Sequence, residues 1–240
     1  MRRDHRPKWL RDLAFARERW WMRTRLAPQF DALGPGAIVA CPWDVEVFGA
    51  GVSAGRHLHV LAAADMRVRL TTWPAPGGAA EITIGDCVLI CGGAQVTAAR
   101  SIEIGDGAML ARGVTITDCD WHGLYDRVTA VQDPKPVRVG ANVWLGDYAF
   151  VGKGVSIGEN AVVGARAVVV TDVPANAVVA GNPAKVVKEL DPAAPRVTRM
   201  DLYKDPGALA AFLDEAWEKE HGDNTLLGWI RSELAPRRGD

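Results

Sequence analysis

One histidine stands among acids and a tryptophan in residues 117–126, TDCDWHGLYD. Histidine is the side chain whose ordinary pKa suits proton transfer near neutral pH. A neighbouring carboxylate can accept a hydrogen bond from one ring nitrogen and so fix the tautomer. We therefore take His122 as a candidate general base and Asp120 as its candidate orienting group, with Asp118 as a second possibility. A solvated loop histidine and aspartates that only form turns are the plainer alternatives.

Two neighbours of His122 leave their roles open. Cys119 would suit a nucleophile only if the histidine were aimed at its sulfur, which three-residue spacing on a loop does not establish. Trp121 suits either the wall of an acceptor pocket or packing. The other histidines, His5, His57, His59 and His221, lie elsewhere in the chain. His57 and His59 form an H-x-H pair, but no histidine lies within five residues of His122, so a three-histidine metal site is disfavoured.

A repeat of six residues surrounds the break that contains His122. From residue 139 the chain reads VGANVW, LGDYAF, VGKGVS, IGENAV, VGARAV and VVTDVP. Position one is aliphatic, position five is small or β-branched, and position two is glycine in the first five hexads. Looser hexads occupy residues 84–101 and 104–116, and still weaker ones residues 48–65. Periods of this kind are typical of solenoids.

Each hexad is interpreted as one short strand and one turn. The aliphatic and small positions point inward and stack on their equivalents in the next coil, and glycine permits the corner. Three hexads make one triangular coil, and the stacked coils share a core. A β-sandwich is the alternative, but its turns usually come every 8–12 residues. Residues 118–136 should then leave the prism as an excursion loop before the register resumes at Val139.

The hexads resemble the [LIV]-G-x-x-[AV]-x repeat of the hexapeptide-repeat acyltransferases, whose fold is a left-handed parallel β-helix. Residues 143–187 are similar to the C-terminal half of maltose and galactoside O-acetyltransferases, and equally to acetyltransferases that modify polysaccharides. The resemblance implies a mainly β fold, a left-handed parallel β-helix. Helical N- and C-terminal extensions are predicted from the residues outside the repeat. The left hand comes from the resemblance alone, because the usual crossover rule favours the right hand.

The resemblance also implies a site. The family's base histidine follows the same strand in a T-x-T-H-P context, which matches His122 although the present loop is two residues longer and lacks the proline. Coenzyme A would lie between neighbouring prisms of a homotrimer, with Trp144 and Trp121 lining the substrate site. The donor contacts carried over from the family are Asp147, Ala165, Thr171, Lys185 and Lys188. The family often has a small residue at the place of Asp147 and a lysine at the place of Thr171, which puts the fit of the nucleotide in question.

We therefore expect an acyltransferase, an O-acetyltransferase in the first instance, that uses acetyl-coenzyme A or another acyl-coenzyme A, with no metal, on a hydroxyl of a small sugar-like or lipid-linked acceptor. An acyl-carrier-protein donor or an amine acceptor is the nearest alternative. A non-catalytic solenoid scaffold and a metal-dependent carbonic-anhydrase-like protein are further ones.

The expected organisation has three parts: a basic, Trp-rich helical extension (1–44), the β-helix (45–188) and a helical C-terminal extension (189–240). Residues 8–26, 205–220 and 224–234 are predicted helices. Residues 1–25 contain nine Lys/Arg and three Asp/Glu, whereas the whole chain has a net charge of −1. The terminal helices either cap the solenoid and pack on neighbouring subunits, or residues 1–26 contact an anionic membrane surface. No base-reading motif suggests nucleic acid.

Four cysteines without framework spacing favour the cytoplasm, with a place at the inner face of the membrane if that contact forms.

Overall fold

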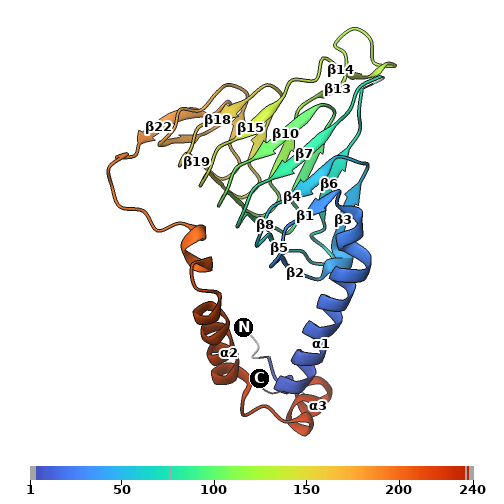
Figure 1. Cartoon of the computed structure of the whole chain (residues 1–240), viewed down its shortest axis with the longest axis vertical. Helices are drawn as coiled ribbons and strands as arrows, with labels where there is room; N and C mark the ends of the chain where they lie inside the picture. The colour runs from blue at the N-terminus through green and yellow to red at the C-terminus, as the bar shows by residue number, and fades with distance from the viewer. Residues whose placement is uncertain (1–3, 76, 236, 238–240) are drawn as a thin grey trace. The chain divides into compact units, whose positions relative to one another are not determined.

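The computed structural model describes residues 4–75, 77–235 and 237, and these form two units (Figure 1). One unit comprises residues 21–201 and contains all of the β-structure. The other combines the described parts of residues 1–20 and 202–240, which are mainly helical.

Three parallel sheets form the faces of a triangular prism. The first sheet consists of β1 (Ala32–Leu33), β4 (Val52–Ala54), β7 (Glu81–Ile84), β10 (Ser101–Ile104), β15 (Val137–Val139) and β18 (Ser156–Ile157). The second consists of β2 (Ile38–Ala40), β5 (His59–Leu61), β8 (Leu89–Cys91), β11 (Met109–Leu110), β16 (Trp144–Leu145), β19 (Val162–Val163), β21 (Ala177–Ala180) and β22 (Lys185–Glu189). The third consists of β3 (Val45–Phe48), β6 (Val68–Thr72), β9 (Gln95–Ala98), β12 (Thr115–Thr117), β17 (Phe150–Val151) and β20 (Val168–Val169).

The chain visits the three sheets in turn, so each coil has three corners, which we name in chain order. Corner I leads from the first sheet to the second, as at residues 140–143 and 158–161. Corner II leads from the second to the third, as at residues 146–149 and 164–167. Corner III leads from the third sheet back to the first, as at residues 152–155 and 170–172. The hexad pattern thus predicts both the strands and their turns.

Aliphatic side chains at the first hexad position form columns inside the prism. In the second sheet Leu110 pairs with Leu145, and Leu145 with Val163, and all three are almost completely buried. Glycine at the second position is required by close approach between coils. A Cβ on Gly140 would lie 2.7 Å from the Glu159 nitrogen, and one on Gly146 would lie 2.7 Å from the Ala165 nitrogen. The same residues therefore fix the core and the spacing of the coils.

One hairpin interrupts the prism at corner III, between β12 and β15. Its strands, β13 (Asp120–His122) and β14 (Ala130–Gln132), pair antiparallel, with His122 opposite Ala130 and Asp120 opposite Gln132. The ladder on either side is intact, because β12 pairs directly with β17, as Thr115 does with Phe150. The hairpin occupies the excursion predicted for residues 118–136 and leaves the register of the coils unchanged.

The solenoid begins earlier than residue 45, because β1 and β2 already form part of its first coil. A π-helical turn, Met22–Leu26, a 3₁₀ turn, Ala27–Gln29, and a second 3₁₀ turn, Pro42–Asp44, accompany this coil. Met22 and Leu26 are buried in the core at this end. The first coil was missed because its residues do not keep the hexad spacing.

The solenoid unit also extends beyond residue 188. Strand β22 turns back antiparallel to β21, and residues 191–201 then return along the prism. The Arg196 guanidinium donates to the Asn176 side-chain oxygen at 2.9 Å. The Arg199 guanidinium donates to the Cys87 carbonyl at 3.1 Å and lies 3.2 Å from His59 Nδ1. We call residues 191–201 the strap; no strand pattern reveals it, so the predicted boundary was too early.

The helical unit is built from α1 (Lys8–Trp21), α2 (Pro206–His221) and α3 (Leu226–Leu234), with a 3₁₀ turn, Arg199–Tyr203, leading into it. Phe15 packs against Trp217 with ring centroids 5.9 Å apart, and the Arg11 guanidinium lies 3.7 Å from the centre of the Trp217 ring. Among the described residues, no helix has the length and apolar character that crossing a bilayer requires.

Candidate active site

The hairpin at corner III presents its two faces differently. Trp121 packs on the small apolar cluster of Ala99, Cys119 and Ala75, so its ring is half-buried against the prism. Side chains alternate along a strand, and Asp120 and His122 are therefore on the other face, where both are exposed. The imidazole of His122 is thus accessible to a substrate, as a general base must be. The surroundings of Trp121 favour its packing role over a pocket wall.

Asp118 anchors the hairpin where the chain leaves the prism. Its side chain is fully buried, and its two oxygens accept hydrogen bonds of 2.7 Å from the backbone nitrogens of Ala99, Arg100 and Ser101. Three such bonds satisfy a buried carboxylate. Asp118 therefore holds the neighbouring coil and is not placed to orient His122.

Asp120 has a cation as its partner. The Lys153 ammonium at corner III of the next coil lies 2.8 Å from Asp120 Oδ2, and it also lies 3.4 Å from Asp133 Oδ2. The hydrogen bond to Asp120, with the two carboxylate charges, raises the pKa of Lys153. Asp120 and His122 share one face of β13, but the carboxylate binds lysine rather than the imidazole in this structure. The two ion pairs join β13 and the residue that follows β14 to the prism.

The thiol of Cys119 is not placed to attack a substrate. It is buried and donates to the Asp120 carbonyl at 3.1 Å. A nucleophilic thiol should be accessible and near a cation or base that favours the thiolate. The position of Cys119 is that of a small core residue beside Trp121.

Most of the residues expected to hold the acyl donor gather on the second sheet and corner II. Trp144 projects outward from β16 and is about half-exposed. Lys188 lies in the same lateral row, since Trp144 pairs with Val162, Val162 with Val178, and Val178 with Lys188. Lys185 lies on the same strand, β22, and both lysines are exposed.

Asp147 and Ala165 occupy corner II one coil apart. The Arg166 nitrogen donates to the Asp147 carbonyl at 2.7 Å, which fixes the stacking of the two turns. Asp147 Oδ1 accepts from the Arg112 nitrogen of the preceding coil at 3.2 Å. Asp86 plays a similar part at corner I, where its Oδ1 accepts from the Arg56 nitrogen. An aspartate at position 147, where the family often has a small residue, thus has a structural reason. Its carboxylate accepts a hydrogen bond from the turn that contains Arg112.

Thr171 lies apart from the other donor residues. It follows β20 at corner III and is exposed. This is the edge from which the His122 hairpin emerges two coils earlier. Within one chain the predicted site is therefore divided: His122, Asp120 and Thr171 lie along corner III, whereas Trp144, Asp147, Ala165, Lys185 and Lys188 lie on the second sheet and corner II, across the third sheet.

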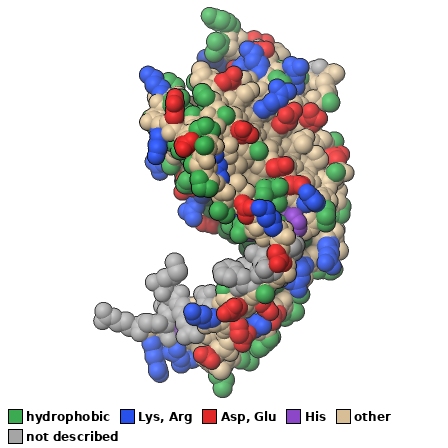
Figure 2. Space-filling view, turned by 60° about the vertical axis from the view of Figure 1, so that its left-hand side comes forward, with side chains coloured by type: hydrophobic (Ala, Val, Ile, Leu, Met, Phe, Trp, Pro, Cys, Tyr) green, Lys and Arg blue, Asp and Glu red, His purple; other side chains and the backbone are tan. Residues whose placement is uncertain are grey.

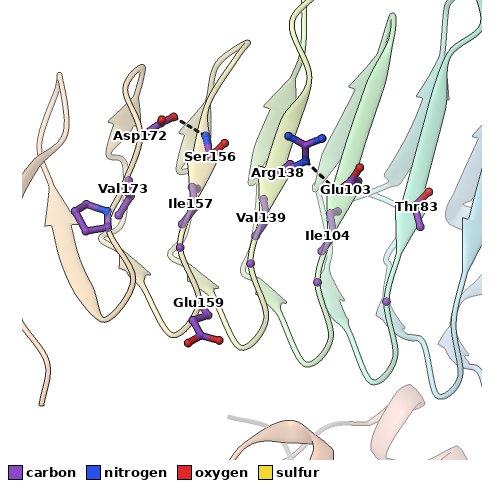
Figure 3. A pocket seen from close by; sticks show the side chains of 15 residues that line it. Thr83, Glu103, Ile104, Arg138, Val139, Ser156, Ile157, Glu159, Asp172 and Val173 are labelled. Atoms are coloured by element: carbon purple, nitrogen blue, oxygen red, sulfur yellow. Dashed lines mark hydrogen bonds and ion pairs between the residues drawn. The ribbon is translucent and has the colours of Figure 1, made fainter. Parts of the chain in front are cut away.

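A groove of about 760 Å³ runs along the first sheet beside corner I (Figure 3). The Arg138 guanidinium donates to Glu103 Oε2 at 3.2 Å, and Asp172 Oδ1 accepts from the Ser156 nitrogen at 2.8 Å. Glu159 stands at the corner end of the groove. No predicted site residue is among the residues that line this groove, and its ionisable side chains are carboxylates and one arginine rather than a histidine.

The H-x-H pair has a different use. His59 projects from β5 beside Arg199 of the strap, and burial together with the Arg199 charge lowers the pKa of His59. The Arg199 guanidinium is thus the neighbour of His59 Nδ1. His59 therefore forms part of the contact between the strap and the prism.

Comparison with known proteins identifies the repeat. The family model described as the bacterial transferase hexapeptide, six repeats, matches residues 136–171. The architecture is the left-handed parallel β-helix of that repeat, as the sequence predicted.

Two kinds of protein are similar to this chain. Galactoside O-acetyltransferase of Escherichia coli is 34% identical over 93 residues, which are 38% of this chain and 45% of that protein, so the match spans less than half of the relative's length. A solved galactoside acetyltransferase bound to coenzyme A is similar with a TM-score of 0.51 and 24% identity, over 72% of each chain. AntD, an N-acyltransferase from Bacillus cereus solved with dTDP and 3-hydroxybutyryl-coenzyme A, gives a TM-score of 0.57 at 16% identity, over 81% of this chain and 96% of AntD.

The structural roles of Asp118 and Lys153 were not predicted from the sequence. Asp118 was considered only as an orienting group, and Lys153 was not considered. The lysine stands at the third position of the hexad VGKGVS, where the other hexads of this block vary. Only the three-dimensional register shows that it lies one coil beyond the break and reaches Asp120.

Proposed function

We propose that the protein is an acyltransferase that moves an acetyl group from acetyl-coenzyme A to a hydroxyl, with His122 as the general base. The observation that carries the proposal is the exposed histidine on the hairpin that interrupts a hexapeptide-repeat prism. The identity with a galactoside O-acetyltransferase supports a hydroxyl of a sugar-like acceptor over an amine. AntD is an N-acyltransferase, and its likeness concerns the fold alone.

The chemistry follows from the residues at corner III. An imidazole nitrogen of His122 takes the hydroxyl proton while the oxygen attacks the thioester carbonyl carbon. The tetrahedral intermediate collapses, the carbon–sulfur bond breaks, and the sulfur leaves with the proton from the imidazolium. The products are an ester and coenzyme A. Asp120 and Lys153 act as positioning residues, since their ion pair holds the strand that carries His122.

The donor is proposed to bind along the second sheet and corner II. Lys185 and Lys188 are exposed cations suited to the nucleotide phosphates. Trp144 offers an aromatic face on the same sheet, and Ala165 is small enough to let pantetheine approach the turn. Asp147 lies at the same corner, and Thr171 is proposed as a contact from the far edge.

The positions of the base and of the donor residues favour a homotrimer. Because the base and the donor residues lie on different edges of one prism, a complete site requires corner III of one subunit to face the second sheet of another. The active sites would then lie between subunits. We expect a mass three times that of the chain in light scattering coupled to size exclusion; a monomer that retains full activity contradicts this part of the proposal.

The test is thiol release from acetyl-coenzyme A in the presence of a panel of sugars, lipid-linked sugars and amines. We expect hydroxyl acceptors to be used, and His122→Ala to lower kcat by about 10²–10⁴-fold. Tyr125→Ala is the matched control, because this residue lies on the same hairpin and is fully exposed. Acylation of amines alone would favour the N-acyltransferase alternative. An unchanged rate in His122→Ala would remove the assigned base.

A further inference from the structure

The helical unit has the reverse of the usual arrangement of an amphipathic helix. In α1, Trp9, Leu13, Ala16 and Trp20 follow the spacing of one helix face, yet none of the four is buried, and Leu13 is 61% exposed. The side chains that face α2 include Arg11 and Phe15, which contact Trp217, and Lys8, which lies 3.3 Å from Glu218 Oε2. The apolar stripe of α1 therefore faces away from the neighbouring helix of its own unit.

Helix α3 repeats the pattern. Leu226, Leu227, Ile230 and Leu234 cluster on one face and are all exposed, with Leu227 79% and Leu234 81% exposed. Its buried side chain is Ser232, whose hydroxyl donates to the Trp229 carbonyl at 2.7 Å. The leucines of α3 are therefore exposed, while its serine is buried.

Polar groups occupy the interior of this unit more widely. His221 is 1% exposed, and its Nε2 lies 2.7 Å from an Arg11 nitrogen and 3.5 Å from Asp4 Oδ2. Hydrogen bonds from Arg6 hold the pKa of Asp4 well below its usual range. A unit that buries a histidine and a serine, partly buries an arginine and exposes two apolar stripes is arranged for a second apolar phase outside it.

The charged side chains near the stripe of α1 help to decide whether a protein or a membrane surface covers it. Arg17 and Arg19 are exposed on α1, and Asp12 is the exposed acid on this helix. Hydrophobic, basic and acidic side chains all reach the surface in the space-filling view (Figure 2). A protein interface would have to bury these guanidinium groups with the stripe, whereas anionic headgroups solvate and pair them. Tryptophan at both ends of the stripe suits the boundary between headgroups and acyl chains.

We propose that α1 and α3 bind the surface of an anionic bilayer, with their apolar stripes in the boundary region and the arginines among the headgroups. The helices lie on the membrane and do not cross it. This inference is independent of acyl transfer, and no acyl donor enters its test.

Co-sedimentation of the full chain with vesicles tests the proposal. The vesicles are phosphatidylcholine alone, or phosphatidylcholine and phosphatidylglycerol in equal parts. We expect binding to the anionic vesicles, weaker binding to the neutral ones, and loss of binding with added salt. Leu13→Glu and Leu227→Glu, on separate helices, should each lower the partition coefficient by about tenfold or more. Ala14→Glu adds the same charge at an exposed position of α1 outside the stripe and should bind as the natural chain does.

Three results would overturn the proposal: a natural chain that stays in the supernatant, stripe variants that still sediment, or an equal loss in Ala14→Glu. A further result would reassign the surface. If Leu13→Glu and Leu227→Glu change the oligomeric mass in solution without changing sedimentation, the stripes form an interface between copies. Circular dichroism of each variant shows whether the helices are retained, and the two helices provide independent readings if one variant fails to fold.

Discussion

The Lys153 ammonium lies 2.8 Å from Asp120 Oδ2 and thereby joins the hairpin of one coil to corner III of the next. Lys153 is mostly shielded, with 23% of its side chain exposed, while Asp120 is open to solvent. The pair therefore acts on the position of β13 more than on the stability of the fold.

Lys153→Met should separate these two effects. Because partly exposed ion pairs contribute little, we expect the free energy of unfolding to change by less than about 1 kcal/mol. The hairpin should become mobile, so kcat should fall several-fold, with a smaller change in the KM for acetyl-coenzyme A. Lys135→Met is the control, since Lys135 pairs with Asp133 at 3.3 Å on the same loop but does not reach Asp120. Equal effects of both variants would contradict a positioning role for Lys153.

Asp118→Ala should destabilise the whole solenoid. The change leaves the backbone nitrogens of Ala99, Arg100 and Ser101 without their acceptor. Hydrogen bonds to a charged group contribute about 1.5–3 kcal/mol each in favourable cases, so we expect a loss of about 3 kcal/mol or more. Urea denaturation followed by circular dichroism measures it.

Asp120→Ala provides the contrast for that measurement, because its exposed carboxylate contacts only a side chain outside the core. A loss in Asp120→Ala as large as that in Asp118→Ala would show that Asp118 is not the anchor of the hairpin.

Lys188→Ala should weaken binding of the acyl donor at its phosphate end. We expect the KM for acetyl-coenzyme A to rise by about three- to tenfold, and the KM for a phosphate-free acetyl-pantetheine to stay the same, because one screened charge contact contributes about 1 kcal/mol. Arg138→Gln removes a cation from the first sheet instead and should change neither value. A similar rise with both donors would place Lys188 away from the phosphates.

The strap should make stability depend on pH through His59. Burial and Arg199 lower the pKa of His59, so the folded chain favours the neutral ring. Below the ordinary value of 6.5 the unfolded chain binds a proton that folded His59 does not take up. The free energy of unfolding should therefore fall as the pH drops below this value, and the loss should stop once the folded ring is protonated.

Urea denaturation near pH 8 and near about pH 5.5 measures this effect. His59→Gln should lose less stability between the two conditions than the natural chain does. Arg199→Gln should also reduce the loss, because it removes one of the two causes of the shift. If His59→Gln and the natural chain lose the same unfolding free energy between the two pH values, other groups account for the pH dependence of stability.

Much of the fold can be predicted from the sequence because each hexad of the repeat corresponds to one strand and one corner of the prism. A hexad with an aliphatic, a glycine and a small residue specifies a strand, a corner and a stacking distance together. The β-helix from β3 onward and the break at corner III were therefore predicted. The first coil and the strap were not, since Pro42 and the segment around Arg199 belong to no repeat. Their positions depend on contacts such as Arg199 with the Cys87 carbonyl, which join residues far apart in the sequence.

The candidate site was predictable in part for the same reason. His122 could be proposed because it interrupts a pattern, whereas Trp144, Asp147 and Ala165 were implied by the resemblance to the acyltransferase family. The partner of Asp120 could not be predicted. Asp120 and His122 share one face of their strand whether or not they form a hydrogen bond with each other. Three-dimensional register assigns that partner to Lys153, and it assigns Asp118 to the coil below.

The pairing of Thr115 with Phe150 across the hairpin has a consequence for how such a protein can change. Thr115 pairs with Gln95 on its other side as if no insertion were present, so the strands tolerate added chain at a corner. A corner can therefore accept, lose or exchange a loop while the prism keeps its dimensions, and the prism can grow only by whole coils. The coils thus fix the shape of the molecule, and the loop that carries His122 can differ in length or sequence without changing the strand pairs beside it.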